Sequence, residues 1–142
     1  MSLKNIHIGK LIEKRVSEVQ MTNERICKSL NCTDLELLNI YDSDNLNTEM
    51  LLKLSKLLQY DFFRIFSQHL ILFSPLPKPN KEANMKKEKS KLPQFRKNIY
   101  TQEIIFFILE LIEKEEKSIA QIINDYQIPK TTLYKWINKY KI

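Results

Sequence analysis

The sequence predicts an all-α protein made of two small helical units joined by a basic linker rich in proline and lysine. The chain of 142 residues contains one glycine, whereas turn-rich β architectures usually need several. A hydrophobic content of 43% is sufficient for a packed core. Apolar residues recur at helical spacing except in residues 74–98, a segment that holds four of the five prolines.

The first unit is predicted to span residues 1–73. Its first helix carries an apolar stripe at i, i+3, i+4, i+8 and i+11, formed by Ile8, Leu11, Ile12, Val16 and Val19. A second short helix is expected to begin at Thr22 as N-cap and to bury Ile26, Cys27 and Leu30. A turn at Asn31-Cys32 follows, because asparagine tolerates the left-handed backbone that such a turn requires.

Three more helices complete this unit. Thr33 and Glu36 have the T-x-x-E spacing of a capping box, which predicts a third helix with Leu35, Leu38 and Tyr41 buried. Thr48 is the predicted N-cap of a fourth helix, whose inward residues are Met50, Leu51, Leu54, Leu57 and Leu58. A fifth segment runs from Tyr60 to Phe73 and is rich in aromatic residues.

The central segment, residues 74–98, is predicted to be a linker, and it carries the entire net charge of the chain. It holds eight basic and two acidic residues, whereas residues 1–73 and 99–142 each contain equal numbers of both, so the net charge of +6 lies in the linker. Such a tether fits along a phosphate backbone, with Lys86, Lys87, Lys89 and Lys91 as candidate phosphate contacts. A solvated, self-repelling spacer would have the same composition.

The second unit, residues 99–142, is predicted to have a similar arrangement of capped helices in a shorter form. One helix runs from Tyr100 to Glu115, and Ser118 and Gln121 form an S-x-x-Q capping box that opens the next. Gln127 and Ile128 make a turn, and Pro129 opens the last helix, 129–141. Two short helices joined by a tight turn, the second one capped, are typical of a helix-turn-helix, and this pattern occurs in both units.

The last helix provides the candidate binding residues. The middle helix is expected to bury Ile119, Ile122, Ile123 and Tyr126, and the last one Leu133, Trp136, Ile137 and Tyr140. The opposite face of the last helix then presents residues suited to base edges or the nearby backbone, namely Lys130, Thr131, Thr132, Tyr134 and Lys135. Asn138 and Lys139 lie later in the helix, where phosphates are the expected partners. An ordinary solvent-exposed helix face is the alternative interpretation.

Residues 99–141 resemble the helix-turn-helix of insertion-sequence transposase accessory proteins. The end of that family's pattern is matched here by Thr131-Thr132-Leu133-Tyr134-Lys135-Trp136-Ile137. Residues 6–66 resemble, more weakly, the helix-turn-helix of phage-repressor-like regulators, and the pair resembles small bacterial proteins of both kinds. The resemblance implies DNA binding without choosing between transposition and transcription. In the second unit the sequence departs from the family pattern at Ile123, where a small residue is usual, at Gln127, in place of a glycine, and at Pro129, in place of a serine. In the first unit the small residue of the family is met by Cys27 and its turn glycine by Asn31.

Residues 33–50 depart from the repressor-like pattern most strongly, because they contain five carboxylates and no Lys or Arg. Carboxylates repel phosphates, whose contacts supply most of the affinity for DNA. The first unit is therefore expected to work by protein contact, for example by pairing two copies of the chain. Such a homodimer would present two C-terminal helices to DNA at once, about one helical turn apart.

Several classes of function are disfavoured. The chain has no glycine-rich phosphate loop, no carboxylate cluster on a sheet domain and only two histidines, His7 and His69, so we expect no enzyme activity and no cofactor. Cys27 and Cys32 have no zinc spacing, and a reduced core is the favoured role over a redox or metal site. The N-terminus lacks the apolar stretch of a signal peptide and no run is long enough to span a membrane, which predicts a cytoplasmic protein.

These observations predict a sequence-specific double-stranded DNA-binding protein of the transposase-accessory or transcriptional-regulator type, which reads DNA mainly with helix 129–141. In a transposition system, the catalytic transposase would be a separate protein. The alternative is a protein-interaction adaptor with two helical units and no specific DNA target.

Overall fold

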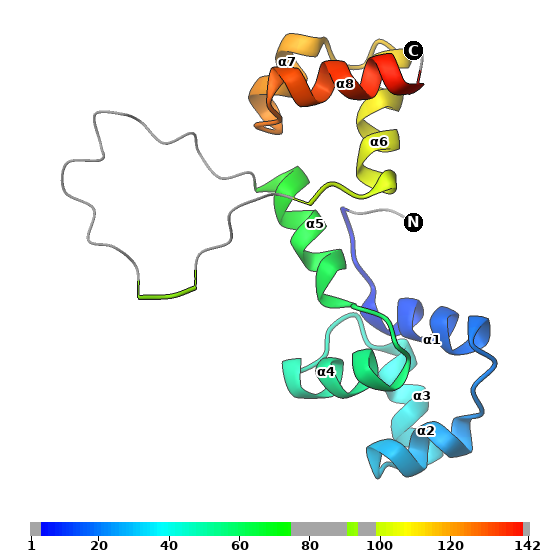
Figure 1. Cartoon of the computed structure of the whole chain (residues 1–142). Helices are drawn as coiled ribbons and strands as arrows, with labels where there is room; N and C mark the ends of the chain where they lie inside the picture. The colour runs from blue at the N-terminus through cyan, green and yellow to red at the C-terminus, as the bar shows by residue number, and fades with distance from the viewer. Residues whose placement is uncertain (1–3, 75–90, 94–98, 141–142) are drawn as a thin grey trace. The chain divides into compact units, whose positions relative to one another are not determined.

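The computed structural model describes residues 4–74, 91–93 and 99–140, and the regular elements in these ranges are all α-helices (Figure 1). In chain order they are α1 (Ile8–Glu18), α2 (Asn23–Leu30), α3 (Asp34–Asp42), α4 (Thr48–Leu57), α5 (Phe63–Phe73), α6 (Gln102–Glu113), α7 (Ile119–Asp125) and α8 (Lys130–Tyr140). The predicted all-α fold is confirmed. The chain divides into two compact units, Met1–Ser67 and Gln68–Ile142, and α5 crosses the division.

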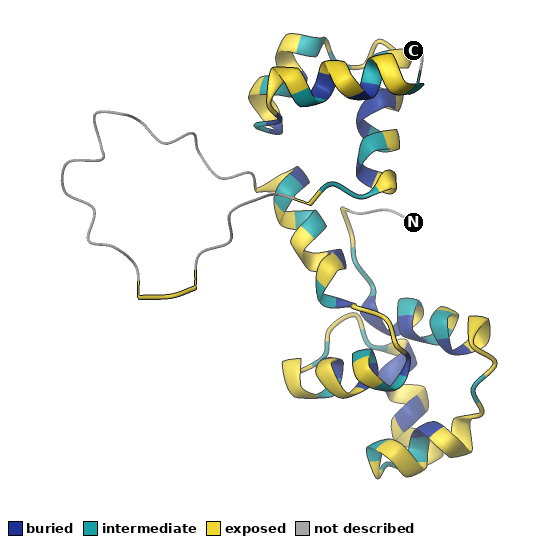
Figure 2. Cartoon of the chain, in the orientation of Figure 1, coloured by how far each residue is buried: buried dark blue, intermediate teal, exposed yellow. Residues whose placement is uncertain are grey.

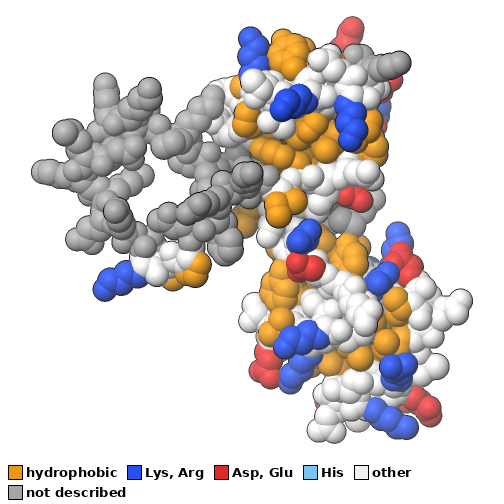
Figure 3. Space-filling view, viewed as in Figure 1, with side chains coloured by type: hydrophobic (Ala, Val, Ile, Leu, Met, Phe, Trp, Pro, Cys, Tyr) orange, Lys and Arg blue, Asp and Glu red, His pale blue; other side chains and the backbone are white. Residues whose placement is uncertain are grey.

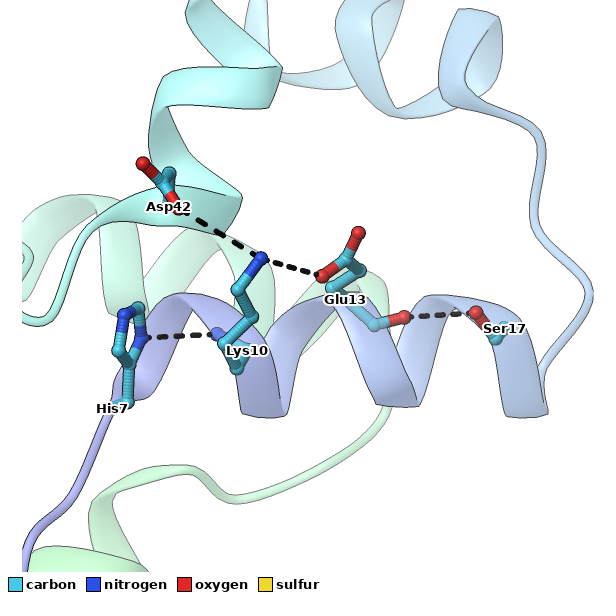
Figure 4. Close-up of polar contacts among 5 residues, drawn as sticks. All are labelled: His7, Lys10, Glu13, Ser17 and Asp42. Atoms are coloured by element: carbon cyan, nitrogen blue, oxygen red, sulfur yellow. Dashed lines mark hydrogen bonds and ion pairs between the residues drawn. The ribbon is translucent and has the colours of Figure 1, made fainter.

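Side-chain caps define where the helices of the first unit begin. The predicted N-cap Thr22 and the predicted capping box of Thr33 and Glu36 are both confirmed. The cap predicted at Thr48 is wrong: Asn47 has the extended backbone of an N-cap, and its Oδ1 accepts the N–H of Met50 at 2.7 Å. His7 also acts as a cap, since its Nδ1 accepts the N–H of Lys10 (Figure 4).

The core of the first unit draws apolar side chains from all of its helices (Figure 2). The predicted apolar stripe of α1 is confirmed at Ile8, Ile12 and Val16, which are buried. The predicted stripe of α4 is confirmed at Leu51, Leu54 and Leu58. Val19 is the C-cap of α1 and is exposed, because the helix ends one residue before it. The buried residues of this core are Ile8, Ile12, Val16, Ile26, Leu37, Ile40, Tyr41, Leu51, Leu54, Leu58, Phe62 and Ile65.

The prediction for the buried face of α3 is wrong at two of three positions. Leu35 and Leu38 are exposed, at 69% and 55%, while Leu37 and Ile40 are buried together with the predicted Tyr41. Both sets of residues have helical spacing, so the sequence pattern does not choose between them. The choice comes from α1 and α2, which both pack against α3 and share a core with Leu37, Ile40 and Tyr41.

The contact between α1 and α3 is close at Gly9. The N–H of Gly9 donates to the carbonyl of Ser43 at 2.9 Å, just beyond the end of α3. The Nζ of Lys10 lies 3.2 Å from Glu13 Oε2 and 3.9 Å from Asp42 Oδ1, so one lysine links the two helices at the surface (Figure 4).

The second unit has a core formed by α6, α7 and α8. Its buried residues include Ile104, Ile108, Leu109, Ile122, Tyr126, Ile128, Leu133 and Trp136. Helix α6 packs against α8, and edge-on aromatic contacts join Tyr100 to Trp136 and Phe106 to Tyr140, with ring centroids 5.0 and 5.2 Å apart. Helix α6 is shorter at both ends than the predicted helix from Tyr100 to Glu115.

Candidate nucleic-acid interface

The start of α7 is fixed by the predicted capping box. The backbone N–H of Ser118 donates to Gln121 Oε1 at 2.8 Å, and the N–H of Gln121 donates to Ser118 Oγ at 3.2 Å. This reciprocal pair satisfies two backbone donors that a helix start otherwise leaves without partners. It is a local arrangement, which explains why the sequence predicted it correctly.

A tight turn leads from α7 to α8. Gln127 has a left-handed backbone with φ of 52°, a conformation that glycine adopts with least strain. Ile128 follows and is buried in the core, which anchors the turn between the two helices. Pro129 was predicted to be the first residue of the last helix, but it lies one residue before α8. Its carbonyl accepts the N–H groups of Thr132 and Leu133.

The inner face of α8 attaches the helix to the second unit. Leu133 and Trp136 are buried, as predicted, and Ile137 and Tyr140 are half-buried. Trp136 contacts Tyr100 edge-on and is buried, which makes the indole part of the core and disfavours its stacking on a base. The orientation of α8 therefore follows from apolar packing on one side.

The outer face of α8 is polar and basic. Thr131, Tyr134, Lys135 and Asn138 are exposed at i, i+3, i+4 and i+7, which places them on one stripe of the helix. The other predicted site residues flank this stripe: Lys130 and Lys139 are exposed, and Thr132 is half-buried. Figure 3 shows basic side chains on the face of the second unit where α8 lies in front.

The lysines of α8 differ in their charge environment from the two lysines that lie between α6 and α7. Lys114 pairs with Glu110, and Lys117 pairs with Asp125. Each hydrogen bond to a carboxylate raises the pKa of its lysine. Helix α8 contains no acidic residue, and its three lysines form no ion pair with the described part of the chain: Lys130, Lys135 and Lys139. Their charge is consequently available to an external anion.

One contact on this face was not predicted from the sequence. The Nζ of Lys130 lies 5.8 Å from the centroid of the Tyr134 ring, within the range of a cation–π interaction. The i, i+4 spacing of the two residues was a signal for it. The contact places the lysine over the ring of Tyr134, on the exposed stripe of α8.

The remaining predicted site residues belong to the central segment. Lys86, Lys87 and Lys89 lie outside the described residues. Lys91 is described and exposed. Their role as phosphate contacts stays a prediction.

The two cysteines are free thiols, both half-buried. Burial, reinforced by a hydrogen bond to Asp34, raises the pKa of Cys27 to about 11. A thiol with a raised pKa is a poor nucleophile and a poor metal ligand near neutral pH. Within the ranges that the structure describes, no group of three or more His, Cys, Asp or Glu side chains is arranged to hold a metal ion.

Among the described helices, none is long and apolar enough to cross a membrane. No protein-family model, curated protein or solved structure matches the chain. The candidate interface is consequently defined by its own residues, and the resemblance to helix-turn-helix families stays an expectation from the sequence.

Proposed function

We propose that the chain binds double-stranded DNA in a sequence-dependent manner and that α8 is the helix that enters the major groove. The observation that carries the proposal is the outer face of α8, where three lysines without an ion pair to the described residues accompany Thr131, Tyr134 and Asn138, and α8 itself contains no carboxylate. An eleven-residue helix is about 16 Å long, and the major groove, about 12 Å wide, admits a helix.

The residues of α8 divide into two roles in this proposal. Those near the start of the helix, Lys130, Thr131 and Lys135 among them, reach base edges, because the N-terminal half of a recognition helix faces the groove floor. Lysine recognises the O6 and N7 atoms of guanine, and hydroxyl groups bond to several bases. Asn138 and Lys139 contact phosphates, which set the orientation of the helix without carrying sequence information.

The proposed DNA binding is compatible with two biological uses. As a transcriptional regulator, the chain would act by occupying its site. As a transposase-accessory protein, it would deliver a separate catalytic protein to the DNA. The stripe on α8 is the same in both uses, so DNA binding is the property that both share.

The test is a selection of bound duplexes from a random DNA pool with the full-length chain, followed by affinity measurements on the selected site. Lys130→Ala and Lys135→Ala should each weaken binding by about 1–3 kcal/mol if the lysine contacts a base. A chain truncated after residue 98 should lose specific binding altogether.

Lys114→Ala is the matched control, because it removes the same charge from an exposed lysine of the same unit. It should leave the affinity nearly unchanged. If no sequence is enriched, or if Lys114→Ala costs as much as Lys135→Ala, α8 does not read DNA and the adaptor alternative is favoured.

A further inference from the structure

Helix α3 occupies the same position in the first unit that α8 occupies in the second. Each follows a short capped helix and a residue with a left-handed backbone, Asn31 at φ of 53° and Gln127 at φ of 52°. Each buries one face in its own core and presents an outward stripe at i, i+3, i+4 and i+7. The two stripes can therefore be compared position by position.

The outward stripe of α3 has a different chemistry from that of α8. It consists of Leu35, Leu38, Asn39 and Asp42, all exposed, with Asp34 exposed at its margin. We call these five residues the α3 face. Leu37, Ile40 and Tyr41 supply the contacts of α3 with the core, and the two exposed leucines do not belong to the core or to the partly buried residues packed against it.

The charge of the α3 face is negative. Asp34 forms no ion pair with the described residues and accepts only a hydrogen bond from Cys27 Sγ at 3.4 Å. Asp42 lies 3.9 Å from Lys10 Nζ, but the same lysine is closer to Glu13, at 3.2 Å. The α3 face is therefore apolar in its middle and acidic at both ends.

This arrangement disfavours two occupants. Carboxylates at both ends of the stripe would face phosphates if α3 entered a DNA groove. In an antiparallel pairing of two α3 helices, Asp34 of one copy would lie opposite Asp42 of the other, and like charges across an interface oppose association. Neither duplex DNA nor a second copy matches the charge of this face.

We propose that the α3 face is a docking site for a basic amphipathic helix of another protein. Apolar side chains of that helix would cover Leu35 and Leu38, and its Lys or Arg side chains would pair with Asp34 and Asp42. Asp42 follows Asp34 by eight positions, which corresponds to about 12 Å along a helix. The partner is thus expected to carry cations at a similar separation on both sides of an apolar centre.

The test uses the full-length chain and two synthetic peptides of about 18 residues, long enough to form an isolated helix. Both peptides carry the same leucine stripe, flanked by Lys in one and by Glu in the other. Fluorescence anisotropy should show that the Lys peptide binds at least about tenfold more tightly, and that added salt reduces the difference. Equal binding of the two peptides would overturn the proposal.

Variants of the chain locate the binding site. Leu35→Ser combined with Leu38→Ser should weaken binding of the Lys peptide by about tenfold or more, and Asp42→Asn should weaken it less. Leu52→Ser is the matched control, because Leu52 is an exposed leucine of α4, 46% accessible. This variant should bind the Lys peptide as tightly as the original chain does. Circular dichroism of each variant checks that the helices are retained.

Other outcomes would contradict the proposal. Unchanged peptide binding by the Leu35 and Leu38 variant would place the peptide elsewhere. Loss of duplex DNA binding in that variant would make α3 a DNA-contacting helix, and conversion of a dimer to a monomer, measured by sedimentation, would make a second copy the occupant. The proposal does not depend on α8, so Lys130→Ala with Lys135→Ala should retain full peptide binding.

Discussion

The only glycine of the chain, Gly9, lies where α1 approaches the end of α3. A Cβ at this position would come within 2.3 Å of the carbonyl oxygen of Ile40 and within 2.6 Å of that of Ser43. These are backbone atoms, which cannot move aside as a flexible side chain can. The chain thus uses its glycine for close packing between helices, while left-handed backbone follows several helices at residues that are not glycine: Gln20, Asn31, Gln59, Glu115 and Gln127.

Gly9→Ala should destabilise the first unit, because the added methyl group forces α1 away from α3. We expect the free energy of unfolding to fall by about 1–3 kcal/mol, the usual cost of overpacking a close contact. The measurement is urea denaturation followed by circular dichroism. Lys14→Ala, at an exposed position of the same helix, should change the stability by less than about 0.5 kcal/mol. Equal stability of the two variants would mean that the close contact has little energetic weight.

At the scale of single elements, both capping boxes were predicted correctly, whereas three other helix starts and the buried face of α3 were not. The capping boxes of α3 and α7 were predicted because a reciprocal bond between residues three apart depends only on those residues. The buried face of α3 was not predicted, because Leu35 and Leu37 each begin an apolar set at helical spacing. Packing of the neighbouring helices determines which of the two sets is buried. The buried face of α8 was predicted correctly at Leu133 and Trp136, because polar residues such as Lys135 and Asn138 occupy the rest of the helix and leave it with one apolar face.

The two capping boxes should respond differently to acid. In α3 the backbone and hydroxyl of Thr33 donate to the Glu36 carboxylate and lower its pKa below the ordinary value of 4.5. This stabilisation is present above the unfolded pKa and is lost as the pH falls through the lower folded pKa. In α7 the corresponding acceptor is the amide of Gln121, which does not titrate.

Glu36→Gln should therefore flatten the loss of stability of the first unit on the acid side, because glutamine keeps the acceptor of the capping box. Urea denaturation midpoints between pH values of about 5 and 3 provide the measurement. The control is Glu24→Gln, which removes an exposed carboxylate from the first turn of α2 without touching a capping box. If the stability of the original chain and that of Glu36→Gln depend on pH in the same way, protonation of the capping box does not affect the stability of the first unit.

At the scale of the whole molecule, charge is the most unevenly distributed property of the sequence. The candidate interface on α8 lies in residues 99–142, where basic and acidic residues are equal in number, while the excess of +6 lies in residues 74–98. Helix packing explains why α8 could be singled out from the sequence, because its apolar face is unambiguous. Helix packing gives no information on what the linker lysines contact, because a basic segment without apolar periodicity has no buried face from which its orientation could be predicted.

Reversal of Lys86, Lys87, Lys89 and Lys91 to Glu should weaken DNA binding for all sequences alike. If each lysine neutralises a phosphate, the dependence of log affinity on log salt concentration should flatten by about one unit of slope for each phosphate that is no longer neutralised. Specificity should be unchanged, because phosphate contacts carry no sequence information. The readout is a salt titration of affinity for the selected duplex and for an unrelated duplex of the same length.

A control is required because four charge reversals also change the net charge of the chain. Reversal of Lys14, Lys28, Lys53 and Lys56, which are exposed in the first unit, changes the net charge equally but at other places. If these variants flatten the salt dependence as much as the linker variants do, the effect comes from long-range attraction, which depends on total charge. If the linker variants leave the slope unchanged, residues 74–98 are a spacer, and the affinity for phosphate must come from α8 and the lysines near it.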